Sequence, residues 1–181
     1  MQSLRNQLRS ATQSQHVKVD ADYGALNLQN RDDLEQFLIS MHAAFEVVEA
    51  FLEDANTEIS LPPRQSLLTG KDLNELGVTD RIPTLEKPTA LTQPLGALYV
   101  IAGASMGRKL QQRQWLESTD PDCRRAGAFL SDTGMADYWR TMRSDLDMQR
   151  PAHPDELNSA SACFELFLDA LNATKPQVTT L

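Results

Sequence analysis

The sequence predicts an all-α fold, a multi-helix bundle. Apolar residues recur at spacings of three and four along most of the chain, which is the pattern of helices that bury one face. No run alternates apolar and polar residues with period two, so strands are not expected. The chain has 181 residues, of which 41% are hydrophobic and 23% charged, and these values suit an ordinary globular domain. We therefore expect one domain over residues 1–181, with roughly six packed helices.

The N-terminal part of the chain contains two predicted helices. The first covers residues 3–19. The second has the clearest pattern, because Asn30 followed three residues later by Asp33 favours a helix cap. After this cap, apolar residues fall at helical spacing: Leu34, Leu38, Met41, Phe45, Val48 and Leu52.

The middle of the chain contains two short predicted helices. Pro62 and Pro63 open one that runs through Leu68. The other covers residues 72–76 and is stopped by Gly77, because glycine commonly follows the last residue of a helix. Residues 78–93 form the longest irregular stretch.

Three longer helices are predicted in the second half. Pro94 suits the first turn of a helix over residues 94–117, whose inward residues are Leu95, Leu98, Ile101 and Leu110. A helix over residues 135–148 carries Tyr138, Trp139, Met142 and Leu146. The last helix, over residues 155–172, carries Leu157, Phe164, Phe167, Leu168 and Leu171.

Charge and composition exclude several classes of partner. The formal net charge is −8, whereas binding to nucleic-acid phosphates needs a basic face, so no nucleic-acid partner is expected. No apolar run is long enough for a membrane span, and no signal peptide is visible, so no membrane partner is expected. Cys123 and Cys163 match neither a disulfide framework nor a zinc motif, which favours a cytoplasmic location. In such an acidic chain, a site for an anionic ligand must concentrate the few basic residues.

His16 is the histidine with the most functional interest. His153 precedes a proline in a predicted loop, and His42 lies one step off an apolar stripe, as a surface or boundary residue does. On a straight helix His16 lies beneath Arg9, two turns or about 10.5 Å along the axis. That separation is comparable to the distance from the iron of haem to a propionate group. One face could therefore offer an imidazole to iron and a guanidinium to a carboxylate, although an ordinary boundary histidine has the same spacing.

Two glycines and two arginines in later helices have equally open interpretations. Gly103 and Gly107 lie four apart in a predicted helix, where each costs about 1 kcal/mol relative to alanine. They allow either close packing against another backbone or the approach of a flat ligand. Arg140 and Arg143 either form a solvated helix face or bind an anion. Motifs for di-iron bundles, zinc proteases, serine hydrolases and nucleotide-binding loops are missing from the sequence.

These features together resemble the haem oxygenase family, particularly the bacterial forms that supply biliverdin to phytochromes. Residues 8–16, LRSATQSQH, look like the family's proximal helix, Leu-basic-x-Ala-Thr-x-x-x-His. Residues 94–107, PLGALYVIAGASMG, look like its distal helix. Residues 138–140, 146–148 and 162–164 also resemble late helices of the family, so that the resemblance spans nearly the whole chain in order.

The resemblance implies roles for six residues. His16 would be the axial ligand of the haem iron. Gly103 and Gly107 would pass across the distal face of the haem and leave room for dioxygen. Arg9 and Arg140 match basic positions that hold propionates, and Phe164 would help to wall the pocket.

The implied activity is the oxygen-dependent cleavage of haem to biliverdin, carbon monoxide and ferrous iron. Haem would be both cofactor and substrate, and the electrons would come from an external donor, either a protein or a small reductant. A bacteriophytochrome would be the acceptor of the biliverdin.

A binding protein without turnover is the alternative. Bacterial relatives commonly have a glutamate at the position of Ala102 and a small residue at that of Arg108, which Lys109 follows here. These differences favour a chain that holds haem or another tetrapyrrole on the same scaffold without cleaving it. A structural or regulatory bundle, in which His16 is an ordinary boundary residue, is a third interpretation.

Overall fold

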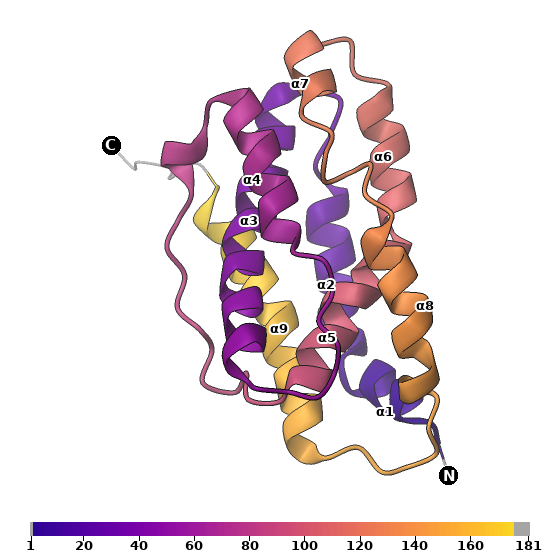
Figure 1. The fold of residues 1–181 in the computed structure, drawn as a ribbon. Helices are drawn as coiled ribbons and strands as arrows, with labels where there is room; N and C mark the ends of the chain where they lie inside the picture. Colours follow the sequence, from indigo (N-terminus) through magenta and orange to yellow (C-terminus); the bar gives the residue numbers. More distant parts are fainter. Residues whose placement is uncertain (1, 176–181) are drawn as a thin grey trace.

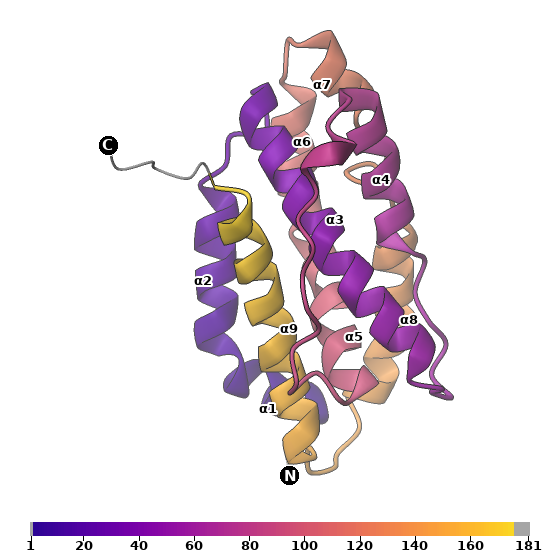
Figure 2. The same ribbon diagram turned by 90° about the vertical axis from the view of Figure 1, so that its left-hand side faces the viewer.

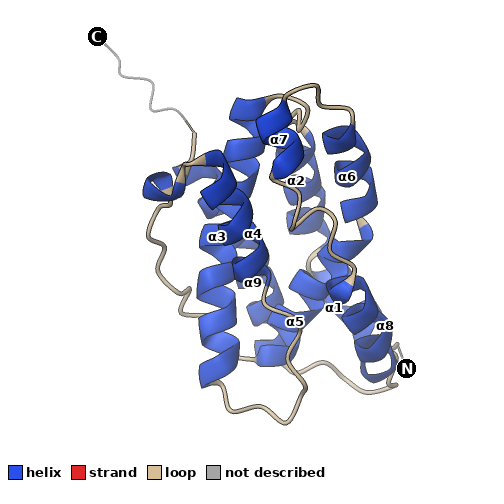
Figure 3. Ribbon diagram, turned by 45° about the horizontal axis from the view of Figure 1, so that its top comes forward, coloured by secondary structure: helices blue, strands red, loops and turns tan. Residues whose placement is uncertain are grey.

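A computed structural model gives the structure of residues 2–175, which form helices and loops without a strand (Figures 1 and 3). The predicted all-α class is therefore confirmed. Residues 1 and 176–181, the two ends of the predicted domain, lie outside the described part of the chain. Within the described range, no helix combines the length and the apolar character needed to cross a bilayer.

The N-terminal helix is interrupted at Thr12, so the prediction of one helix over residues 3–19 is wrong. Helix α1 covers Leu4–Ala11 and α2 covers Gln13–Gly24. Thr12 leaves the helical region, with φ −109° and ψ 9°, and its hydroxyl donates a hydrogen bond of 2.8 Å to the carbonyl of Leu8. The Leu8 carbonyl therefore accepts from both the hydroxyl and the backbone N–H of Thr12, and such side-chain bonds bend helices. Arg9 and His16 consequently lie on different helices.

The next elements confirm the predicted caps but join two predicted helices. Helix α3, Arg31–Asp54, begins after Asn30, whose side chain accepts from the N–H of Asp33 at 2.9 Å. Helix α4 is continuous over Gln65–Leu76, and Gly77 ends it with φ 72°. The predicted gap between residues 68 and 72 does not exist. Gly70 lies inside α4. A side chain at this position would crowd the His42 ring, because a Cβ on Gly70 would lie 3.2 Å from it.

The predicted helix over residues 94–117 is also broken. Helix α5 ends at Gly103 (Pro94–Gly103), a 3₁₀ turn η2 covers Ala104–Met106, and α6 covers Arg108–Leu116. The hydroxyl of Ser105 donates to the carbonyl of Ala102 at 2.6 Å and so satisfies a group that the interruption releases. The break changes the register of the following turns, and Leu110, predicted to face inward, is 74% exposed.

The remaining helices have bounds close to those predicted. Helix α8 covers Gly134–Leu146 and α9 covers Pro154–Ala173. Two short elements were not predicted, the 3₁₀ turn η1 (Thr79–Arg81) and α7 (Pro121–Arg125). His153 caps the N-terminus of α9 and is therefore a structural residue.

Helix α9 is the central element of the packing. It packs against α5, α3, α2 and α1 (Figures 1 and 2). Its contact with α5 is the tightest, because a Cβ on Gly96 would lie only 2.8 Å from the backbone nitrogen of Ala160 and would overlap the carbonyl of Glu156. This close approach fixes the position of α5 relative to α9.

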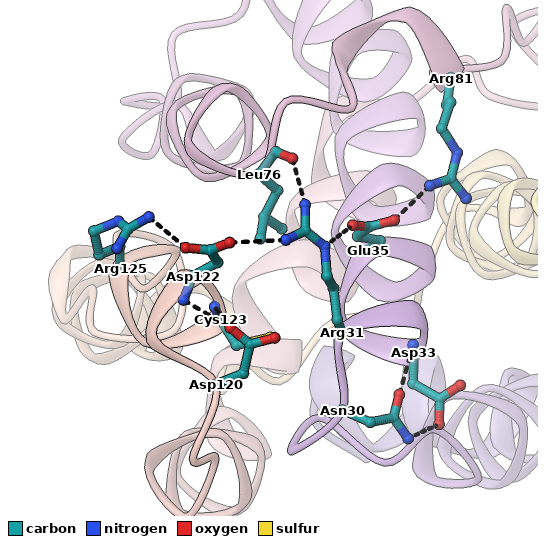
Figure 4. Close-up of polar contacts among 10 residues, drawn as sticks. All are labelled: Asn30, Arg31, Asp33, Glu35, Leu76, Arg81, Asp120, Asp122, Cys123 and Arg125. Carbon is teal, nitrogen blue, oxygen red and sulfur yellow. Dashed lines mark hydrogen bonds and ion pairs between the residues drawn. The ribbon is translucent and has the colours of Figure 1, made fainter.

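A polar network ties together the end of the bundle that carries α7 (Figure 4). The guanidinium of Arg31 donates to Glu35 at 2.7 Å, to Asp122 at 3.0 Å and to the carbonyl of Leu76 at 2.8 Å. Arg81 also pairs with Glu35. The network therefore joins α3, α4, η1 and α7.

The start of α9 generates a prediction for pH dependence. Burial by itself raises the pKa of Glu156, but the hydrogen bonds from Arg150 and from the His153 N–H outweigh burial and hold this pKa below the usual 4.5. The stabilisation by the carboxylate is therefore present above pH 4.5 and is lost as the pH falls through the folded pKa. At neutral pH, Glu156→Gln should lower the free energy of unfolding by about 1–2 kcal/mol, as measured by urea denaturation.

The difference between Glu156→Gln and the wild type should shrink as the solution is acidified below pH 4.5. Glu165→Gln, an exposed position of the same helix, is the control and should show no such difference. An equal difference for Glu156→Gln at neutral and acidic pH would contradict the assignment.

Candidate ligand-binding cavity

A cavity of about 570 Å³ lies among α1, α2, α5, η2, α8 and α9. Sites for small molecules and cofactors have volumes of about 300–1,000 Å³. The breaks at Thr12 and at residues 104–106 both border it, so the interrupted helices supply walls of different direction. Four of the six residues implied by the family resemblance line this cavity: Arg9, His16, Gly103 and Phe164.

His16 presents its imidazole to the cavity from α2. Its side chain is 56% exposed, and Nδ1 lies 3.2 Å from a carboxylate oxygen of Asp20, one turn later on the same helix. The Phe164 ring packs against it in a nearly perpendicular arrangement, with 5.7 Å between ring centroids. A carboxylate at Nδ1 orients an imidazole and leaves Nε2 as the atom that can bind a metal.

The end of α5 and η2 form one wall of the cavity, in which two of the residues are a glycine and an alanine. Gly103, Ala104 and Met106 line the cavity, and Met106 is 66% exposed. A Cβ on Gly103 would meet only the ring of Trp139, at 3.7 Å, so Gly103 is not required by close backbone packing. Gly107, by contrast, is exposed and lies outside the cavity lining, at the start of α6.

Three arginines line the cavity, although the chain is acidic overall. Arg5 pairs with Asp147 at 2.9 Å, and Arg143 lies 3.6 Å from the same aspartate. Arg9 has no ion-pair partner among residues 2–175. Arg140, which the family resemblance assigned to a propionate, is outside the lining, where its 75% exposed side chain pairs with Asp137. The cavity thus holds the arginine one turn beyond the one assigned.

Two aromatic residues complete the lining between α5 and α8. The rings of Tyr99 and Trp139 have centroids 6.3 Å apart. Burial raises the pKa of Tyr99, and the side chain of Thr12 and the positive charges of Arg9 and Arg5 oppose that shift only in part. The Tyr99 hydroxyl is therefore protonated at neutral pH and is a hydrogen-bond donor beside Thr12.

Ala102 and Arg108, the two positions that depart from the pattern of the resemblance, do not line the cavity. Ala102 is fully buried in the core. Arg108 is also buried, and its guanidinium binds Asp132 and Gln65 over the ring of Phe129. Neither side chain can therefore act directly on a ligand in the cavity.

A second hollow of about 520 Å³ lies between α3 and residues 82–87. It contains His42, whose Nδ1 is 2.9 Å from the hydroxyl of Thr69. This hollow has no arginine in its lining and a single lysine, Lys87, whose ammonium also contacts the Phe51 ring and the carbonyl of Leu91. It offers less to an anionic ligand than the first cavity does.

The first cavity combines apolar and aromatic walls with three arginines and one imidazole. No group of three or more His, Cys, Asp or Glu side chains gathers within residues 2–175 to hold a metal ion by itself. One imidazole is sufficient, however, for a metal that brings its other ligands with it, as haem iron does. No model of a known protein family and no curated protein matches the sequence.

Sequence reasoning missed Arg5, Tyr99 and Trp139 as cavity residues, and it left Arg143 open between a solvated helix face and an anion site. Helical spacing contained a signal for Arg5, Tyr99 and Arg143. Arg5 precedes Arg9 by four residues, Tyr99 precedes Gly103 by four, and Arg143 follows the inward Trp139 by four. Asp20 bears the same relation to His16.

The glycines of α5 generate a stability prediction. Gly96→Ala should lower the free energy of unfolding by about 1–3 kcal/mol, because its Cβ meets the backbone of α9. Gly103→Ala should leave it unchanged or raise it by up to about 1 kcal/mol, because the position is helical and open. Urea denaturation of both variants measures the contrast. An equal loss of stability in the two variants would mean that Gly103 is a packing glycine.

Proposed function

We propose that the cavity binds haem and that the protein is a haem oxygenase. The reaction is the cleavage of haem to biliverdin, carbon monoxide and ferrous iron, with dioxygen and electrons from an external protein or small-molecule donor. The observation that carries this proposal is the position of His16, whose imidazole lines the cavity with Nδ1 at Asp20 and its ring against Phe164.

The lining suits the apolar body of haem. Val17 and Met106 are 61% and 66% exposed, and both lie on the cavity wall. Large apolar side chains exposed in one cavity lining mark a surface that a ligand or partner covers. Trp139 and Phe164 add aromatic surface. The volume and the apolar lining therefore fit a flat, largely apolar ligand.

The arginines suit the two propionates of haem. Arg9, exposed and without a described ion-pair partner, is the cation best placed to accept a carboxylate. Arg5 and Arg143 already pair with Asp147, so a ligand carboxylate would compete with Asp147 for them. Arg140 lies outside the lining and is assigned no role in this proposal.

Haem supplies the redox chemistry when it is bound and is itself the substrate. His16 would hold the iron through Nε2, because the Asp20 carboxylate lies 3.2 Å from Nδ1 and leaves Nε2 open. Gly103 contributes a cavity wall without a side chain, which leaves space for a small second ligand. Tyr99 keeps its proton and acts as a hydrogen-bond donor, since burial raises its pKa.

A haem-binding protein without turnover is the second candidate, and one observation favours it. Asp20 is the only acidic residue among the described residues of the lining, and it faces His16. The wall formed by α5 and η2 therefore has no carboxyl group that could deliver protons. The lack of a carboxyl group in this wall is therefore what favours the binding protein, whereas Ala102 and Arg108 do not line the cavity.

The cytoplasmic location follows from the cysteine pattern, and the biliverdin acceptor follows from the family resemblance. We propose a cytoplasmic enzyme built on one domain over residues 1–181, with a bacteriophytochrome as the acceptor of biliverdin.

The assignment of His16 is tested by titration with hemin. The wild type should give a sharp Soret band with a one-to-one end point, and His16→Ala should lose this band. Added imidazole should restore the band in His16→Ala, because the empty place at the iron is then filled by a free ligand. His42→Ala is the matched control, since it removes the histidine of the second hollow, and it should bind hemin as the wild type does.

Unchanged binding by His16→Ala, or loss of binding by His42→Ala, would contradict the site. Adding a reductant under oxygen then separates the two candidates. The haem oxygenase predicts that the Soret band decays while the absorption of biliverdin grows, whereas a stable ferrous-oxygen spectrum supports the binding protein.

The role of Arg9 is tested with hemin and its dimethyl ester. The wild type should bind the diacid about two- to fivefold more tightly, which corresponds to about 0.5–1 kcal/mol for a partly exposed ion pair. Arg9→Gln should reduce this preference. Arg140→Gln should retain it, and a preference lost in Arg140→Gln alone would show that Arg140 holds the carboxylate.

A further inference from the structure

Arg108 is a buried cation at the start of α6, directly after the break that forms part of the cavity wall. Its side chain is only 7% exposed. Nη1 donates to Asp132 at 3.2 Å, Nη2 donates to Gln65 at 2.8 Å, and the guanidinium carbon lies 4.1 Å from the centroid of the Phe129 ring. The guanidinium therefore has two hydrogen-bond partners and one aromatic contact within the protein.

Asp132 connects this cation to the start of α8. Its two carboxylate oxygens accept from the N–H groups of Gly134, at 3.1 Å, and Met135, at 3.3 Å. These are the first two residues of α8, the helix that places Trp139 and Arg143 on the cavity wall. One ion pair thus joins the residue that directly follows η2 to the beginning of α8, and both η2 and α8 line the cavity.

Gln65 anchors the pair to the rest of the bundle. It is fully buried at the first position of α4. Its side-chain oxygen accepts from Arg108, and its amide nitrogen lies 3.5 Å from Asp132. Its backbone N–H donates to Glu49 of α3. The pair is therefore anchored to α4 directly and to α3 through Glu49, and neither helix lines the cavity.

We propose that Arg108 is a positioning residue that fixes the spacing between the η2 wall and the α8 wall of the cavity. A buried ion pair contributes little net stability compared with a well-packed apolar replacement, but it specifies one geometry. Arginine suits this role because its planar fork binds two acceptors at once, which lysine cannot do in the same way. That the cavity holds haem rests on the proposed function, whereas the coupling of the two walls does not.

Hydrogen exchange of the ligand-free protein tests the coupling. Arg108→Met removes the ion pair and retains an unbranched apolar side chain. Exchange of the backbone amides should rise by at least about tenfold, equivalent to about 1.4 kcal/mol of local opening free energy, in both residues 103–109 and residues 134–139. Arg108→Lys should give a smaller rise in the same two segments.

Arg31→Met is the matched control. Arg31 also has three polar partners on other elements and in its own helix (Figure 4), but none of these residues lines the cavity. At urea concentrations that equalise global stability, Arg31→Met should leave residues 103–109 and 134–139 unchanged. A rise limited to residues 103–109 in Arg108→Met, or an equal rise in Arg31→Met, would overturn the proposal. If Arg108→Met does not fold, Arg108→Lys and Asp132→Asn provide the same comparison.

Hemin binding provides the second measurement. Arg108→Met should bind hemin with a shifted Soret maximum and faster hemin release, whereas Arg31→Met at matched stability should behave as the wild type does. Unchanged spectra and release in Arg108→Met would overturn a positioning role at the ligand. If the wild type binds no hemin, the proposed function fails, and hydrogen exchange still decides whether Arg108 couples the two walls.

Discussion

The close approach of α5 to α9 at Gly96 is the contact on which the rest of the cavity depends. With no side chain at Gly96, the two backbones meet, and the apolar residues of α5 enter the core beside those of α9. This contact leaves Gly103, at the other end of α5, facing Trp139 instead of another backbone. The same packing places Phe164 of α9 against the ring of His16. A core contact therefore determines which residues can meet a ligand.

Two interrupted helices turn this packed core into a binding site. Thr12 ends α1 through its own hydroxyl bond to Leu8, and residues 104–106 turn the chain between α5 and α6. Each interruption is stabilised by a local hydrogen bond, from Thr12 in one case and from Ser105 in the other. Straight helices would present one continuous face, whereas these breaks let neighbouring turns border a common cavity. The second break is followed directly by Arg108, whose buried guanidinium pairs with Asp132 and, as we propose, specifies the position of the wall.

Much of the fold could be predicted from the sequence, because helical periodicity and caps are local signals. Asn30 and Gly77 have the capping roles that their residue types favour, and α8 and α9 lie close to the predicted ranges. The breaks could not be predicted in this way, since Thr12 and Ser105 are tolerated inside helices and interrupt them only through specific bonds. The error at Leu110 follows directly from the second break. For the site, the sequence indicated His16, Arg9, Gly103 and Phe164, which the structure brings into one cavity. It could not decide between Arg140 and Arg143, because the choice depends on how α8 is rotated, nor could it reveal that Arg108 is buried.

The central claim is that His16 is the residue through which this protein holds haem. The most direct measurement is a crystal structure of the protein grown with hemin. The account predicts one haem in the cavity between α2 and α5, with its iron bonded to Nε2 of His16 and a propionate beside Arg9. Haem bound at His42 in the second hollow, or in the first cavity without a bond to His16, would contradict it.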